Sequence, residues 1–223
     1  MRESRCPDAI FFDLDGTLID TAPDMGGALN IMLQKRERPA IPADAYRSSV
    51  SHGTSALLNL GFSKSELETD MQSLRAEFLS TYDQNIAIGS VLFDGVTDLL
   101  ESLEEQKIPW GIVTNKPEAL TLKLLDTLKL TERCCSIVAA DTTTHAKPHP
   151  APMNLACKRA SVRPDHCFYI GDTERDIEAG RAVAMKTFVA SWGYIDDVTD
   201  TPEHWGADAH LATPLELLDH LGE

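Results

Sequence analysis

Short apolar runs that end in polar residues recur along the chain and indicate buried strands. The runs are continuous and lack the polar–apolar alternation of a strand exposed on one face, which is typical of strands covered on both faces. They occupy residues 10–12, 110–113, 137–140, 167–170 and 187–190. Because long segments suited to crossover helices separate them, the pattern predicts an α/β fold with a doubly wound parallel sheet.

Apolar residues recur at helical spacing between these strands. In residues 96–106, for example, Leu99, Leu100 and Leu103 form one apolar stripe. The same reasoning predicts helices over residues 118–128 and 151–160. Helix and strand therefore alternate through this part of the chain.

The interval 18–91 breaks the alternation, because it reads as helix, turn, helix without a convincing buried strand. Thr21-Ala-Pro-Asp24 resembles a capped helix start, with a hydroxyl followed three residues later by a carboxylate. A second helix is expected over residues 64–82, where Leu67, Met71, Leu74 and Phe78 repeat at helical spacing.

Two domains follow from this organisation. We predict a Rossmann-like core built from residues 1–17 and 92–223, with a helical cap inserted at residues 18–91. A length of 223 residues suits a core that carries one smaller insertion.

Asp13 and Asp15 follow the first predicted strand directly, at the carboxyl end where open α/β sheets bind ligands. Hydrolysis of a phosphate monoester through an aspartyl-phosphate needs one ionised carboxylate as the nucleophile and one carboxyl group that protonates the leaving alkoxide. Two neighbouring carboxylates whose pKa values are pushed apart can divide these roles.

Polar residues after later strands supply what such a reaction also needs. Asp172 and Asp176 offer oxygen ligands suited to Mg²⁺, Lys147 offers a point charge, and Thr114 offers a hydroxyl donor. Each signal alone has an ordinary structural explanation as a turn or a helix cap. Their order, each at the end of a predicted strand, favours a catalytic site.

At these positions the chain resembles the haloacid dehalogenase superfamily. Four segments carry the resemblance, namely Asp-Leu-Asp-Gly-Thr at 13–17, Val-Thr-Asn at 113–115, Lys-Pro at 147–148, and Gly-Asp at 171–172 followed by Asp176. The resemblance implies the superfamily's α/β core and, for the insertion, a helical cap of the C1 type.

The resemblance also implies a role for each matched residue. Asp13 would be the nucleophile and Asp15 the general acid and base. Thr114 and Asn115 would surround the phosphate, with Lys147 as its cationic partner. The metal, Mg²⁺, would be held by Asp13, Asp172 and the backbone carbonyl of Asp15, with Asp176 assisting from nearby.

Asp15 narrows the reaction class, because dehalogenases and phosphonate-cleaving members of the superfamily lack a carboxylate there. The insertion is similar to the cap of the phosphoglycolate phosphatase and β-phosphoglucomutase branch. Segments such as Leu92-Phe-Asp-Gly-Val and Trp205-Gly-Ala-Asp further resemble phosphatases of N-acetylmuramic acid 6-phosphate. We therefore expect the partner to be a small phosphorylated sugar or acid. N-acetylmuramic acid 6-phosphate is the favoured candidate, and 2-phosphoglycolate is the alternative.

Two further alternatives stay open. One is a mutase of the β-phosphoglucomutase kind, although Asp-Gly-Thr resembles the hydrolases more than the mutases' usual Asp-Gly-Val. The other is a phosphoryl-accepting signalling module, which also uses an aspartate, a lysine, a threonine and Mg²⁺. Such modules carry their acidic pair ahead of the accepting aspartate and have no cap, so the motif order disfavours them.

Residues outside the four segments could contact the substrate. Ser51, His52 and Thr54 fall at a predicted turn of the cap, where a closing cap would touch the leaving group. Lys116 and Arg175 flank the motifs and could bind an anionic end, but surface ion pairs are expected for both.

The composition excludes other partners. A net charge of −15 argues against nucleic acid, which is bound through clustered lysine and arginine. No apolar run approaches the roughly 18 residues of a membrane-spanning helix, and the first residues lack an apolar signal region. Five scattered cysteines, including the adjacent Cys134 and Cys135, suggest no zinc or redox site, so we expect a reducing cytoplasm.

Overall fold

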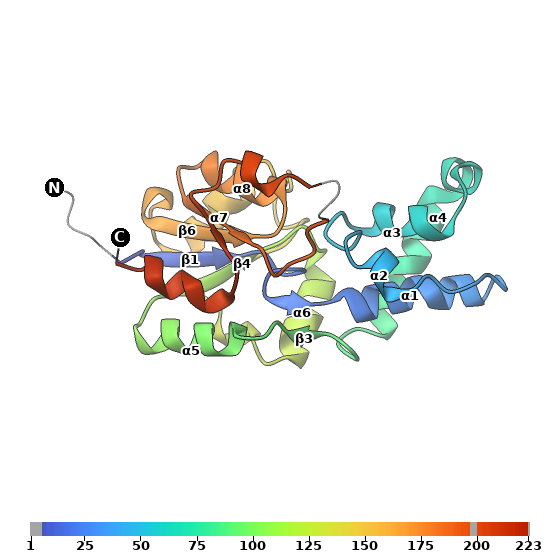
Figure 1. Ribbon diagram of the computed structural model, residues 1–223, viewed down its shortest axis with the longest axis horizontal. Coiled ribbons are helices and arrows are strands. Elements are labelled where there is room, and N and C mark those ends of the chain that lie inside the picture. Colours follow the sequence, from blue (N-terminus) through green and yellow to red (C-terminus); the bar gives the residue numbers. More distant parts are fainter. Residues whose placement is uncertain (1–5, 197–199, 223) are drawn as a thin grey trace. The chain divides into compact units, whose positions relative to one another are not determined.

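The computed structural model describes residues 6–196 and 200–222 and divides the chain into two compact units (Figure 1). The core unit comprises Met1–Ile19 and Leu92–Glu223, and the cap unit comprises Asp20–Val91. The first boundary thus falls at residue 19, where the sequence placed it at residue 17.

The core unit is built on a six-stranded sheet in the order β5-β4-β1-β6-β7-β8, and every pairing is parallel. Its strands are β1 (Ala9–Phe12), β4 (Trp110–Val113), β5 (Ile137–Val138), β6 (Cys167–Gly171), β7 (Lys186–Ala190) and β8 (Ala209–Leu211). All four residues of β1 are fully buried, as a central strand covered on both faces requires. The predicted α/β fold with a parallel sheet is confirmed.

Two strands differ from the expectation. β5 ends at Val138, because the next two amides turn to other partners: Ala139 N donates to Thr142 Oγ1 and Ala140 N to the carbonyl of Lys116. β8 has only three residues, of which His210 is exposed, so it left no apolar run in the sequence.

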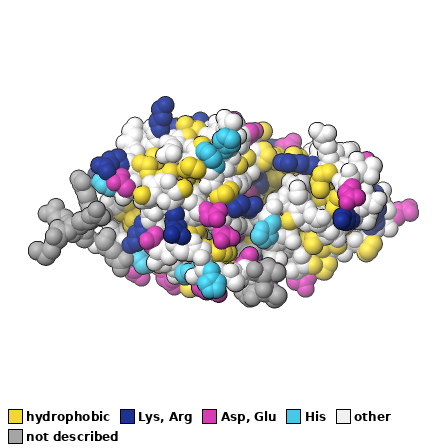
Figure 2. Space-filling model, turned by 90° about the horizontal axis from the view of Figure 1, so that it is seen from above, with side chains coloured by type: hydrophobic (Ala, Val, Ile, Leu, Met, Phe, Trp, Pro, Cys, Tyr) yellow, Lys and Arg dark blue, Asp and Glu magenta, His cyan; other side chains and the backbone are white. Residues whose placement is uncertain are grey.

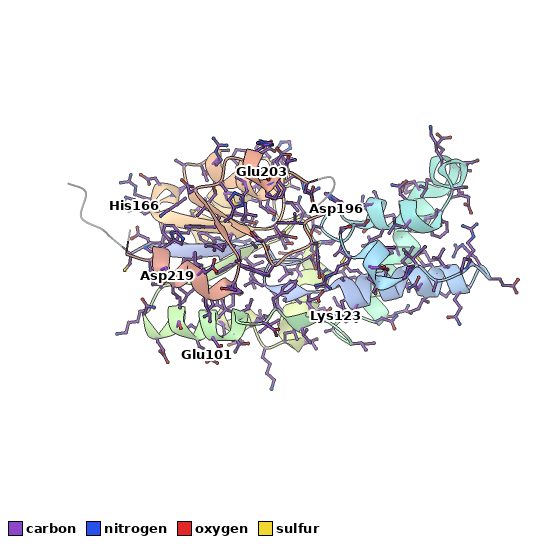
Figure 3. All side chains as sticks on the ribbon, viewed as in Figure 1. Glu101, Lys123, His166, Asp196, Glu203 and Asp219 are labelled. Carbon is purple, nitrogen blue, oxygen red and sulfur yellow. The ribbon has the colours of Figure 1, made fainter. Side chains whose placement is uncertain are left out.

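Helices cover both faces of this sheet. They are α5 (Val96–Glu105), α6 (Glu118–Thr127), α7 (Ala151–Ala160) and α8 (Glu174–Arg181), with short 3-10 segments η1 (Thr131–Arg133), η2 (Pro164–His166), η3 (Pro202–His204) and η4 (Pro214–His220). Figure 1 shows α7 and α8 on one face, and α5 with η4 on the other. Glu101 of α5, labelled in Figure 3, is exposed, and so is Asp219 of η4, while Leu99, Leu100 and Leu103 are buried. These helices lie where the apolar stripes predicted them.

The cap unit contains four helices: α1 (Ala22–Gln34), α2 (Ala43–Tyr46), α3 (Thr54–Gly61) and α4 (Lys64–Gln84). α4 packs against α1 and α3 through buried residues such as Leu29, Leu58 and Phe78. The simpler helix, turn, helix prediction was wrong, because α2 buries no residue and α3 buries only Leu57 and Leu58, too little for a visible period.

The expected cap at the start of α1 was also wrong. Thr21 makes no capping hydrogen bond with its side chain. Asp24 instead accepts from Gly89 N at 2.7 Å, Ser90 N at 3.0 Å and the Ser90 hydroxyl at 2.5 Å. This carboxylate holds the end of the insertion just before β3 (Val91–Leu92), which pairs with β2 (Ile19–Asp20) in a two-stranded sheet.

The surface carries charges of both signs. On the face seen in Figure 2, lysine, arginine, aspartate and glutamate side chains are interspersed in small groups among apolar ones. None of the described helices combines the length and the apolar character that crossing a bilayer requires.

Candidate active site

The carboxyl ends of the central strands bring the predicted core residues together. Asp13 follows β1, Thr114 follows β4 and Asp172 follows β6, while Lys147 lies in the loop before α7. Parallel strands end at one edge of the sheet, so residues separated by more than 150 positions meet there. The Thr17 hydroxyl, for example, donates to Asp172 Oδ1 at 3.1 Å.

The turn after β1 is tight, and Gly16 makes it possible. The amides of Leu18 and Ile19 both donate to the carbonyl of Leu14. Gly16 has φ of 87°, a conformation that side chains disfavour. A Cβ atom at this position would lie 2.1 Å from Asp172 Oδ2, so the close approach of the turn to Asp172 also needs glycine.

Lys147 is the central cation of the site, and its side chain is 2% exposed. Its ammonium lies 2.9 Å from Asp13 Oδ1, 2.6 Å from Asp176 Oδ1 and 2.9 Å from the Tyr169 hydroxyl. Burial acts to lower the pKa of this lysine, but the two carboxylates outweigh burial and raise the pKa above its ordinary value. Lys147 therefore stays charged inside the protein.

Asp13 is buried, and burial raises its pKa from 3.8 to about 6 against the opposing effect of Lys147. The ammonium of Lys147 lies 2.9 Å from Asp13 Oδ1. Apart from this ion pair, the buried oxygen has no hydrogen-bond partner among the residues that the structure describes. A buried carboxylate oxygen in this situation is suited to a cation.

Asp13, Asp172 and Asp176 form a buried cluster in which one oxygen from each lies within 4.8 Å of the others. The backbone amide of Tyr194 donates to Asp172 Oδ2 at 3.0 Å, which fixes this carboxylate in addition to Thr17. Three carboxylates at this spacing form a candidate site for a hard divalent cation.

Asp176 differs from Asp172 because one of the donors to its oxygens is the ammonium of Lys147. Oδ1 accepts from Lys147, and Oδ2 accepts from the hydroxyl of Thr173 at 2.6 Å and its amide at 3.1 Å. The geometry therefore gives Asp176 a role in holding Lys147.

Asp15 lies beside a different cation. Lys116 Nζ is 2.9 Å from Asp15 Oδ1, and the two side chains are 4% and 16% exposed. The expectation of a surface ion pair for Lys116 was wrong, because packing of the core rather than the local sequence decides which lysine is buried. Arg175 lies half-buried on α8.

Thr114 and Asn115 line the end of β4. Thr114 is buried and its oxygen accepts from Lys116 N at 3.2 Å, so its own hydrogen can be donated to another group. Asn115 instead uses both ends of its carboxamide on the backbone of Lys147, donating to the carbonyl at 3.0 Å and accepting from the amide at 2.9 Å. Asn115 thus positions Lys147, and its direct contact with phosphate stays a prediction.

Sequence reasoning missed Tyr169 and Thr173. Tyr169 donates to the carbonyl of Val113 at 2.7 Å and contacts Lys147, but its place in a buried strand gave it the appearance of a core residue. Thr173 stands three residues before Asp176, a helix-capping pattern that could have revealed their contact.

The cap residues proposed for substrate contact all belong to the cap unit. Ser51 and His52 lie in a turn, and Thr54 begins α3 after Gly53, whose φ is 82°. Their contact with a substrate stays a prediction.

Comparison with known proteins identifies the family. Residues 10–190 match the haloacid dehalogenase-like hydrolase family. The chain is 42% identical to a phosphoglycolate phosphatase of Xanthomonas campestris, with 96% of each chain covered. It is 38% identical to an N-acetylmuramic acid 6-phosphate phosphatase of Pseudomonas putida, with 94% and 93% covered.

A solved structure supports the fold. A protein of Haemophilus somnus, described as a predicted phosphoglycolate phosphatase, superposes with a TM-score of 0.81 at 22% identity, covering 95% of this chain and 96% of that one. The chain belongs to the haloacid dehalogenase-like hydrolase family and is a phosphoric monoester hydrolase.

Proposed function

We propose that this enzyme hydrolyses a small phosphomonoester through an aspartyl-phosphate on Asp13 and depends on Mg²⁺. The observation that carries the proposal is that two neighbouring carboxylates lie beside different cations. Asp13 contacts Lys147 and Asp15 contacts Lys116, while the two carboxylate side chains are similarly buried, at 12% and 16% exposed. Neighbouring carboxyl groups in unlike environments are what a reaction with separate nucleophile and acid requires.

In the first half of the reaction, a carboxylate oxygen of Asp13 attacks phosphorus and the bond from phosphorus to the ester oxygen breaks. Asp15 gives its proton to the departing alkoxide. In the second half, Asp15 takes a proton from water, the water oxygen attacks phosphorus, and the bond to Asp13 breaks to release phosphate. Thr114 and Lys147 would stabilise the charge on the phosphoryl oxygens.

The carboxylate cluster is suited to a magnesium ion, because one oxygen each of Asp13, Asp172 and Asp176 lies within 4.8 Å of the others. Asp13, Asp172 and the backbone carbonyl of Asp15 would hold the ion, with Asp176 assisting through Lys147. When bound, the ion supplies positive charge that offsets the repulsion between a carboxylate and a phosphate.

For the substrate, we propose N-acetylmuramic acid 6-phosphate, which would place the enzyme in cell-wall recycling in the cytoplasm. Relatives named for this substrate at 38% identity support the assignment, as do the matching segments of the core. The second candidate is 2-phosphoglycolate, which is supported by relatives of that name at 42% identity.

The test is a panel of substrates ranked by kcat/KM with Mg²⁺ present. It contains N-acetylmuramic acid 6-phosphate, 2-phosphoglycolate, p-nitrophenyl phosphate and β-glucose 1-phosphate. Multiple turnovers with release of inorganic phosphate support a phosphatase, and the top rank assigns the substrate. Isomerisation of β-glucose 1-phosphate would instead support a mutase, and a single turnover that leaves a stable phosphoprotein would support a signalling module.

A further inference from the structure

Lys116 is a second buried cation at the carboxyl end of the central strands, and the reaction described above does not use it. Its side chain is only 4% exposed. Lysine is seldom buried to this extent without a partner, because removing an ammonium from water is costly. The partner of Lys116 is Asp15, so this lysine lies beside a group of the proposed reaction.

The backbone of Lys116 is held in place by its neighbours. Its amide donates to Thr114 Oγ1 at 3.2 Å, and its carbonyl accepts from the amide of Ala140 at 3.0 Å and from the Thr121 hydroxyl at 3.4 Å. These contacts fix the backbone of Lys116 just after β4. Its side chain extends to Asp15, whose Oδ1 lies 2.9 Å from the ammonium.

The two buried lysines serve different parts of the site. Lys147 contacts the nucleophile Asp13, so its charge lies on the phosphoryl side. Lys116 contacts Asp15, the group that protonates the ester oxygen, so its charge lies on the side of the leaving group. Asp15 thus lies between the ammonium of Lys116 and the ester oxygen that it would protonate.

We propose that Lys116 determines specificity by binding a carboxylate of the leaving group. This inference rests on the proposed function, because it assigns Asp15 to the ester oxygen. An ammonium carries three donors and can serve a ligand carboxylate together with Asp15. Both candidate substrates carry such a group: 2-phosphoglycolate has it two bonds from the ester oxygen, and N-acetylmuramic acid 6-phosphate has it on the lactyl substituent.

The experiment compares matched substrates that differ in this carboxylate. One pair is 2-phosphoglycolate and 2-hydroxyethyl phosphate, and the other is N-acetylmuramic acid 6-phosphate and N-acetylglucosamine 6-phosphate. The ratio of kcat/KM within a pair is measured for wild type, Lys116→Met, Lys116→Arg and the control Lys123→Met, which removes an exposed lysine of α6 (Figure 3). Because both rates come from one preparation, partial unfolding of a variant cancels in the ratio.

Wild type should prefer the carboxylate-bearing member of one pair, and Lys116→Met should reduce that preference by about 10- to 100-fold, the range for a charged hydrogen bond. Lys116→Arg should keep part of the preference, and Lys123→Met should keep all of it. The pair that responds identifies the source of the carboxylate.

Equal loss for both members of each pair in Lys116→Met would overturn the proposal, since it would mean that Lys116 acts only through Asp15. Wild type without preference in either pair would overturn it as well, and needs no variant. If wild type hydrolysed none of the four esters, the proposed function itself would fail.

Discussion

Lys147 and Asp176 form a buried ion pair, with Nζ 2.6 Å from Oδ1 and side chains that are 2% and 0% exposed. The pair joins the loop before α7 to the first turn of α8. Because the same ammonium also lies beside Asp13, Asp176 fixes the position of the cation against the nucleophile.

Asp176→Asn should therefore reduce both stability and activity. Removing the charge of Asp176 leaves the buried ammonium of Lys147 with less compensation. Because Asp13 still faces Lys147, we expect a loss of about 3 kcal/mol in the free energy of unfolding, at the low end for a broken buried pair. Urea unfolding at pH 7 measures this loss. Asp165→Asn, which breaks the exposed pair with Arg163, is the control and should change stability far less. A loss no greater than that of the control would contradict the structural role.

Asp13→Asn should abolish turnover and phosphoenzyme formation, because an amide is a poor nucleophile. Its stability without metal should be equal or higher at pH 7. In the folded protein the pKa of Asp13 is raised to about 6, so the protonated carboxyl group contributes stability that is lost as pH rises through 6. Asparagine stays neutral at every pH and avoids that loss. Phosphate release and thermal unfolding are the two measurements. Full activity in a verified preparation would refute Asp13 as the nucleophile.

Asp15→Asn should lose far more activity towards sugar phosphates than towards p-nitrophenyl phosphate, since an aryl oxide leaves without needing a proton. We expect the two losses in kcat/KM to differ at least about 10-fold, within the 10²- to 10⁴-fold contribution typical of general acid catalysis. Equal losses on both substrates would remove the acid role from Asp15.

EDTA should stop hydrolysis and Mg²⁺ should restore it, whereas Ca²⁺ should not, because its longer bonds and larger shell loosen the geometry. Asp172→Ala should raise the Mg²⁺ concentration needed for half-maximal activity. Since Asp13 has a pKa of about 6, the metal must displace its proton at low pH, and Mg²⁺ should bind about 10-fold more tightly at pH 7 than at pH 5. Calorimetry measures the binding. Activity that survives exhaustive chelation would argue against a metal.

Replacing Ser51, His52 or Thr54 with alanine should lower kcat/KM for the preferred substrate. The loss should correspond to about 1 to 3 kcal/mol of transition-state stabilisation, the value of one or two polar contacts. A small aryl phosphate should be hydrolysed nearly as before, because it does not reach those groups. The ratio of the two kcat/KM values in each variant is compared with that of wild type. A constant ratio in all three variants would show that this turn does not select the substrate.

The amino-acid sequence by itself determined the core of this protein. Continuous apolar runs revealed the strands, because a strand buried on both faces has no polar positions, and the polar residues that end β1, β4 and β6 revealed the site edge. The positions of Asp13, Asp15 and Asp172 follow from this local pattern. The apolar pattern did not reveal β8 or the helices α2 and α3, because each of these elements buries too few residues to produce a repeat of apolar positions.

Only the tertiary structure decided which charges meet. The contact of Lys116 with Asp15 joins residues 101 positions apart, and that of Lys147 with Asp176 joins residues 29 apart. Burial of an ammonium depends on what packs around it, so the same local sequence fits a solvated lysine at position 116 as well as a buried one. Likewise, the Asp24 carboxylate takes no part in a cap at the start of α1 and accepts hydrogen bonds from Gly89 and Ser90, because the end of the insertion returns beside it. Local pattern sets where elements form, and packing between distant elements sets which polar groups lose water and must find partners.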